Sequence, residues 1–162
     1  MDRRQIAAKL VVDKLGLDFR MDSFSNRLIL QKAIYLAQAS GVDLGYYFSW
    51  YLRGPYCSTL AGDGFAIQEE QKNGSKETQN WHLGDSAKAN LRRIQPVFDE
   101  KDEGKLARKL ELLASIHFLM SRKNLTELSD IHHVCEEYQK GFSLNEIREG
   151  MKELKRYGLV QR

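Results

Sequence analysis

The sequence of 162 residues is poor in cysteine and proline, with two of each, and it has no long hydrophobic run. Cys57 and Cys135 lie far apart without C-x-x-C spacing, which argues against a disulfide scaffold or a zinc ribbon. The apolar stretch after Met1 is short and is interrupted by Lys9 and Asp13. It does not have the apolar core of a signal peptide, and no segment approaches the length of a membrane span. We therefore expect a cytoplasmic protein with reduced thiols and no membrane association.

A strong excess of one charge is also lacking. Lysine and arginine number 25 against 22 aspartate and glutamate, which leaves a net charge of +3. The excess is spread over both halves of the chain, so neither half forms the basic footprint typical of a nucleic-acid-binding domain. A nucleic-acid partner is therefore disfavoured.

Sequence signals for catalysis and metal binding are weak. The G-x-S-x-G, Walker and G-x-G-x-x-G motifs are absent. On a helix, His132, Cys135 and Glu136 would share a face, but a structural zinc site needs four ligands, and no second pair follows at suitable spacing. Cys57 would need a neighbouring base to act as a nucleophile. We therefore expect no catalytic residues, no metal and no cofactor.

Hydrophobic periodicity predicts a mainly α-helical fold with a small β-sheet, an α+β class in which the helices form the core. An extended segment is predicted at 46–53, and a short strand at 78–83 is expected to pair with it. Helices are predicted from capping residues, apolar spacing and breakers, at 3–15, from Ser23 or Ser25 to about Ala39, at about 58–71, from Asp85 or Ser86 to Pro96, at 105–121, at about 126–138 and at 143–157. The chain reads as a single domain, 1–162, with a charged turn at 99–104 as a candidate boundary between lobes 1–98 and 99–162.

The last three predicted helices are typical of a winged-helix-like helical core. The third begins at Ser143 with Glu146 three residues later, the pattern of a capping box. In a winged helix this third helix would enter the DNA major groove. DNA binding is therefore an alternative function, although the helix has a net charge of only +1 and phosphate contacts need a larger excess. The residues that would contact DNA are Arg148, Lys152, Lys155 and Arg156.

The most unusual segment is residues 46–56, which hold six of the sixteen aromatic residues. Alternation places Tyr46, Phe48, Trp50 and Leu52 on one side of an extended chain, and Tyr47, Ser49, Tyr51 and Arg53 on the other. Aromatic residues suit buried strands, so one interpretation is a core strand that is buried on both faces. The other is a strand that packs by one face and exposes an aromatic and basic surface to a partner.

Two stretches around this segment resemble a known family. Residues 27–36 read RLILQKAIYL, which is similar to the LQK-hydrophobic-Y helix of the Panacea domain. Residues 48–56 read FSWYLRGPY, which is similar to that domain's aromatic-x-x-Gly-Pro turn, and above all to its YwgA-like members. Cys57 stands where those members usually have serine. The motifs occur in the family's order and spacing, and they cover about residues 25–63.

The resemblance implies a mostly helical fold with a small sheet and no enzymatic activity. Panacea proteins act as antitoxins or as proteolytic adaptors, so the implied partner is a protein, either a toxin or a protease substrate. The residues expected to bind the partner are Tyr47, Tyr51, Arg53, Gly54, Pro55 and Tyr56. The motif residues expected to be structural are Leu30, Gln31, Lys32, Tyr35, Trp50, Cys57 and Leu60.

The Gly54-Pro55 corner is expected to form a rigid turn that ends the strand and leads into the next helix. The free N–H groups at 57–60 then have two possible roles: they bind an anion, or they are capped internally by Asp63 or a nearby hydroxyl. Lys32 also has two interpretations. Its head group either snorkels or meets an internal carboxylate, and it becomes functional only if it faces a cleft.

Overall fold

The computed structural model describes residues 1–161, and it is mainly α-helical with one small antiparallel sheet, as the sequence predicts. Two short 3-10 helices, η1 and η2, complete the described elements. In chain order the elements are α1 (Arg3–Lys14), α2 (Phe24–Ala39), β1 (Ser49–Tyr51), β2 (Gly54–Tyr56), α3 (Ser58–Lys72), η1 (Glu77–Asn80), α4 (Asp85–Ile94), η2 (Gln95–Phe98), α5 (Glu103–Arg122), α6 (Leu128–Glu137) and α7 (Leu144–Arg156).

Local capping chemistry sets where several helices begin. Ser23 caps α2 by accepting a hydrogen bond from the backbone N–H of Asn26 at 3.0 Å. Ser143 caps α7, and Glu146 returns the bond to the Ser143 backbone N–H at 3.0 Å, so the predicted capping box is present. Such caps satisfy N–H groups that have no partner within the helix. The predicted starts of α2 and α7 are therefore confirmed.

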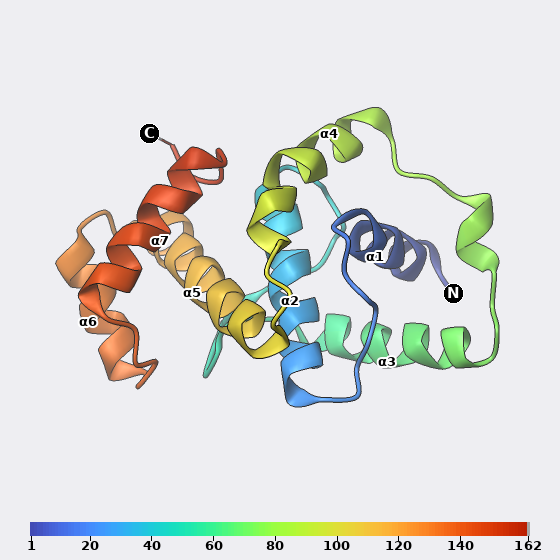
Figure 1. Ribbon diagram of the computed structural model, residues 1–162, viewed down its shortest axis with the longest axis horizontal. Helices are drawn as coiled ribbons and strands as arrows, with labels where there is room; N and C mark the ends of the chain where they lie inside the picture. The colour runs from blue at the N-terminus through green and yellow to red at the C-terminus, as the bar shows by residue number, and fades with distance from the viewer. Residues whose placement is uncertain (162) are drawn as a thin grey trace.

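Helix α2 lies at the centre of the molecule, with α5 packed beside it (Figure 1). Every residue from 30 to 37 is buried, as the nearly all-round apolar sequence of this helix predicts. Helices α1 and α3 lie on one side of this pair, and α6 and α7 lie on the other (Figure 1). The buried apolar residues form one cluster that includes side chains from both sides of the turn at 99–104. The two segments that meet at this turn therefore share a core.

The three C-terminal helices pack against one another, and a glycine sets the closest approach of α5 and α7. A Cβ atom at Gly150 would lie 2.6 Å from the Cδ1 atom of Ile116, which is buried in α5. This distance is too short for a side chain, so the two helices approach closely only because position 150 is glycine. Residues 157–161, which follow α7, contain no strand.

The predicted strand at 78–83 is wrong. Residues 77–80 form the 3-10 helix η1, which is closed by i to i+3 hydrogen bonds such as that from the Trp81 N–H to the Thr78 carbonyl. Trp81 instead packs against the guanidinium of Arg3, 5.8 Å from its ring centroid, and it has no neighbouring strand in the described chain. A short alternating pattern requires a partner strand to become a sheet, and the fold places none here. Within residues 1–161, no helix is long and apolar enough to cross a membrane.

Candidate functional site

Strands β1 and β2 form a tight hairpin, and its turn lies at Leu52 and Arg53. The expectation that Gly54-Pro55 ends the strand is therefore wrong, because both residues belong to β2. Gly54 follows the turn with a φ of +91°, a conformation that other residues rarely adopt. A Cβ atom there would also lie 2.5 Å from the Ser115 hydroxyl of α5. Pro55 is tolerated in this strand because a two-stranded hairpin has free edges that need no N–H donor.

Gln31 and Lys32 of α2 form hydrogen bonds with the backbone of β2 and of Cys57, which follows it. The Gln31 side-chain amide accepts a hydrogen bond from the Cys57 backbone N–H at 2.9 Å and donates one to the Cys57 carbonyl at 2.8 Å. The Lys32 Nζ atom donates to the Pro55 carbonyl at 2.6 Å. All three bonds are buried, where an unpaired polar group is costly. The Gln-Lys pair of the family-like motif therefore serves to dock β2 and the start of α3.

Lys140 and Glu111 form a second set of contacts, with the turn of the hairpin. The buried Nζ atom of Lys140, in the loop between α6 and α7, donates to the Leu52 carbonyl at 3.1 Å and to the Glu111 carboxylate at 3.4 Å. The same Nζ lies 5.1 Å from the centroid of the Trp50 ring. The outer partner of Glu111 is Arg53, with 3.8 Å between the nearest charged atoms. The pairing of Lys140 with Glu111 was not predicted from the sequence, because 29 residues separate them in the chain.

Burial changes the ionisation of both lysines. Burial lowers the pKa of Lys32 from 10.5 to about 7, although the charge of Glu111 opposes the change. Burial also lowers the pKa of Lys140, with Glu111 again opposing it. Lys32 contacts a backbone carbonyl and has no carboxylate within ion-pair distance in the described chain. The expectation that it snorkels or meets an internal carboxylate is therefore wrong.

Tyr35 and Trp50 support the hairpin through packed aromatic rings. The Tyr35 hydroxyl lies 2.7 Å from Nδ1 of His117, whose Nε2 lies 3.0 Å from the Leu159 carbonyl. Because a carbonyl only accepts, Nε2 carries the hydrogen and Nδ1 of the neutral ring accepts from Tyr35. Burial lowers the pKa of His117, which favours this neutral form. The Trp50 ring packs on Phe118, with centroids 5.5 Å apart.

The aromatic segment is buried on one face, so the interpretation of a strand buried on both faces is wrong. Tyr46 and Phe48 are buried, whereas Tyr47 is 77% exposed and Tyr51 is 60% exposed. Leu52 was expected on the buried side, but it is 71% exposed because it lies in the turn, where alternation ends. The segment therefore presents an exposed aromatic face.

A groove lies between the hairpin and the first turns of α2 and α3, and we call it the hairpin groove. Its volume is about 560 Å³. Tyr51 and Tyr56 stack on each other at one edge, with ring centroids 5.5 Å apart, and the Arg53 guanidinium lies 5.3 Å from the centroid of the Phe24 ring. The apolar walls are formed by Phe24, Leu28, Tyr51, Leu52, Tyr56 and Phe65.

Only some of the residues that were expected to bind a partner line the hairpin groove. Tyr51, Arg53 and Tyr56 line the hairpin groove, whereas Gly54 and Pro55 are buried in β2 and do not line it. Tyr47 lies apart from the groove, with the Arg122 guanidinium 5.4 Å from its ring centroid. The expected structural residues Leu30, Cys57 and Leu60 are buried in the core.

Phe24 and Phe65 were missed as groove residues. A usable signal exists only for Phe24, a large apolar residue that stands between Ser23 and Ser25 at the start of its helix, whereas Phe65 lies between Gly64 and Ala66 and carries no such signal.

The side chain of Cys57, the N-cap residue of α3, makes no capping bond, and of the N–H groups at 57–60 that of Cys57 is accepted by Gln31. The expected cap by Asp63 or a nearby hydroxyl is therefore wrong. Asp63 is directed elsewhere: its carboxylate accepts hydrogen bonds from Arg4 and Gln5 at 3.0 Å and from the Tyr46 hydroxyl at 2.8 Å. This carboxylate links α1 to the aromatic segment. It is therefore a structural bridge and not a helix cap.

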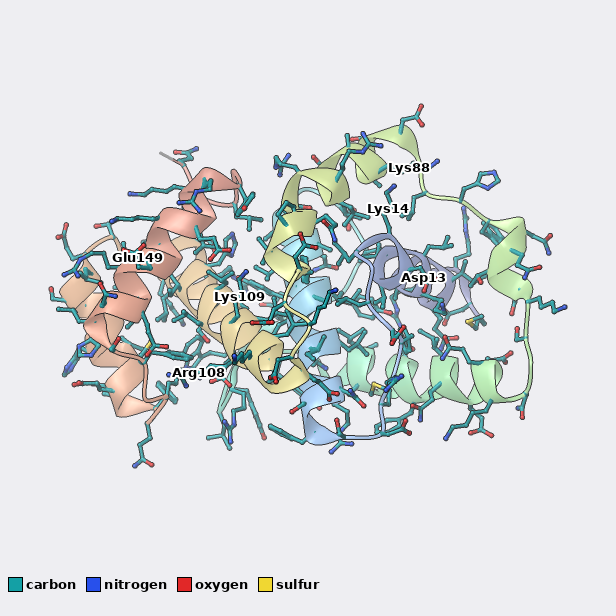
Figure 2. The ribbon with its side chains drawn as sticks, in the orientation of Figure 1. Asp13, Lys14, Lys88, Arg108, Lys109 and Glu149 are labelled. Carbon is teal, nitrogen blue, oxygen red and sulfur yellow. The ribbon has the colours of Figure 1, made fainter. Side chains whose placement is uncertain are left out.

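The basic residues predicted as a DNA surface, Arg148, Lys152, Lys155 and Arg156, are exposed on α7. Acidic side chains lie among them: Lys152 pairs with Glu149 at 3.3 Å, and Glu153 pairs with Lys109 of α5 at 3.2 Å. Figure 2 shows Lys109 on α5 and Glu149 on α7. These acidic partners reduce the positive potential that would attract phosphates.

The His132–Glu136 segment does not assemble a ligand set. The half-buried His132 lies 3.3 Å from Glu136, the exposed His133 lies 3.0 Å from Glu137, and Cys135 is buried. Among residues 1–161, no group of three or more histidine, cysteine, aspartate or glutamate side chains is placed to hold a metal ion.

Comparison with known proteins yields no relative, since no family model, no curated protein and no solved structure matches the chain. The resemblance to the Panacea domain therefore rests on the two motifs. Hydrogen bonds join the two motifs in the structure: Lys32 of the first binds the Pro55 carbonyl of the second, and Gln31 of the first binds the Cys57 backbone directly after it.

Proposed function

We propose that this protein is a non-enzymatic protein-binding module and that its partner binds in the hairpin groove. The observation that carries the proposal is the clustering of exposed apolar side chains. Of the nine large apolar residues that are exposed within residues 1–161, five line this groove, with exposed fractions from 36% to 71%. An apolar cluster of this kind is typical of an interaction site on a soluble protein.

The composition and rigidity of the groove support the same proposal. Tyrosine and arginine contribute disproportionately to binding energy at protein interfaces, and Tyr51, Tyr56 and Arg53 stand together here. The hairpin that carries them is fixed by the buried bonds of Gln31 and Lys32. A surface that is already ordered loses little conformational entropy when a partner binds.

The resemblance to the Panacea-domain family indicates which role and which kind of partner to propose. The implied role is that of an antitoxin or a proteolytic adaptor, with a toxin or a protease substrate as the partner. We also propose a cytoplasmic location, which is supported by the two buried, unpaired cysteines. The alternative of a DNA-binding regulator that uses α7 has no comparable support, because glutamates lie among its basic residues.

Affinity capture from the source cell tests the proposed function. Wild-type protein and Leu52→Asp, which places a charge in the groove wall, are used as baits, with Tyr47→Ala as the matched control. Leu52 and Tyr47 are the two most exposed large apolar residues of the described chain, but only Leu52 lines the groove. We expect Leu52→Asp to lose the captured partner and Tyr47→Ala to retain it. Equal capture by Leu52→Asp, with an unchanged circular dichroism spectrum, would contradict the proposal.

A further inference from the structure

The charged groups of the hairpin groove are all of one sign. Arg27 and Arg53 line it as positive charges, the buried amine of Lys32, whose pKa is about 7, lines it as a partly charged group, and no acidic residue of the described chain does so. The Arg27 side chain donates a hydrogen bond to the Met21 carbonyl at 3.0 Å, and it forms no ion pair with an acidic side chain among residues 1–161. The groove therefore combines apolar walls with a positive potential, although the whole chain is nearly neutral.

Arg53 is the basic residue best placed to meet an incoming anion. Its side chain is 61% exposed, and its ion pair with Glu111 is long, at 3.8 Å. Glu111 is also bound more closely by Lys140, at 3.4 Å, and its charge acts on Lys32 as well. One buried carboxylate is thus shared between the ion pairs of Lys140 and Arg53. A second carboxylate beside Arg53 would complete the pairing, and arginine binds carboxylates through two parallel hydrogen bonds.

The shape of the groove favours a peptide over a lipid. Phe24, Leu52 and Phe65 are each more than half exposed, so the walls stand open to water along the groove. An acyl chain lying there would stay partly wet, whereas the backbone and side chains of a peptide would cover the walls. A volume of about 560 Å³ is within the range of small-ligand sites, so a short segment fills it.

From the charge and shape of the groove, we infer that its occupant is a short peptide segment in which bulky apolar side chains lie next to a carboxylate. The apolar side chains fill the space between Phe24, Leu52 and Phe65, and the carboxylate pairs with Arg53. The inference rests on the proposed function and specifies the chemistry of the partner.

Selection from a display library of random nonapeptides tests this inference. The intact protein is used as bait, and the selected peptides are measured by fluorescence polarisation against wild type, Arg53→Glu, Leu52→Asp and the control Tyr47→Ala. We expect enrichment of aspartate or glutamate beside leucine, isoleucine or phenylalanine. We expect Arg53→Glu to weaken these peptides at least about tenfold, because it replaces a charge-assisted bond by repulsion. Tyr47→Ala should leave their affinity unchanged.

Failure of the inference and failure of the proposed function give different results. Peptides that depend on Leu52, carry no acidic residue and bind Arg53→Glu as well as wild type would overturn the acidic partner and leave the groove as a binding site. If no selected peptide depends on Leu52, or if dodecanoate displaces the peptides and itself binds the groove more tightly, the peptide occupant is wrong. The proposed function would then be judged by the capture experiment alone.

Discussion

Replacing Lys32 by methionine should remove a pH dependence of stability that the buried amine imposes on the fold. The side chain is 1% exposed, and its Nζ donates to the Pro55 carbonyl beneath the hairpin. Methionine keeps the length and the apolar stem but has no titratable group. The variant therefore isolates the titration of Lys32 from the packing of its side chain.

The expected sign and size follow from the pKa of Lys32, which burial lowers from 10.5 to about 7. Between these values the unfolded chain holds a proton that the folded chain does not, so the free energy of unfolding rises with pH. The rise is present only in this window and is complete above the unfolded value. At 1.36 kcal/mol per pKa unit, the free energy of unfolding of the wild type should rise by about 4 kcal/mol relative to that of the variant between pH 7 and pH 10.

Urea unfolding monitored by circular dichroism measures this difference at pH 6.5, 7.5, 8.5 and 9.5. Groups common to both chains contribute to both curves, so the wild-type value minus the Lys32→Met value reports chiefly on Lys32. The lost hydrogen bond to Pro55 lowers the stability of the variant by an amount that changes little with pH. Lys152→Met removes an exposed lysine and serves as the control. A difference curve that stays flat within about 1 kcal/mol would refute the reasoning, since the linkage predicts several times that change.

Three further variants test the contacts that form the hairpin and the helix crossing. Gly54→Ala should cost about 3 kcal/mol in urea unfolding, because alanine is strained at a φ of +91° and its Cβ clashes with α5; a loss below about 1 kcal/mol would contradict this. Gln31→Ala should cost about 1–3 kcal/mol by the same assay, because it leaves the Cys57 N–H buried without a partner, while the Cys57 carbonyl keeps its bond from the Ala61 N–H; a neutral result would show that water replaces the amide. Gly150→Ala should cost about 1–3 kcal/mol, and adding Ile116→Val should restore part of it; a double variant no more stable than Gly150→Ala would place the clash elsewhere.

Local signals in the sequence predicted the helices well because their causes are local. The apolar run of residues 30–37 indicated a buried central helix, and Ser23 and Ser143 lie at the starts of α2 and α7. The strand at 78–83 was predicted wrongly because a strand requires a partner, which depends on distant parts of the chain. The same limit explains why the turn at Leu52 was misplaced.

The candidate site was predicted in part. Tyr51 and Arg53 were identified because alternation marks one exposed face of a short aromatic segment, and Tyr56 was identified through the family-like Gly-Pro-Tyr motif. Phe24 and Phe65 come from α2 and α3, and no sequence spacing shows that these helices meet the hairpin. Lys140 was missed for the same reason, since its bond to the Leu52 carbonyl joins residues 88 positions apart.

Hydrogen–deuterium exchange of the protein with its captured partner tests the central claim most directly. If the partner occupies the hairpin groove, protection on binding should appear at residues 51–56, at the first turns of α2 and at the start of α3. Residues 144–156 of α7 and the loop around Tyr47 should exchange as in the free protein. Protection confined to α7, with the hairpin unchanged, would contradict the account.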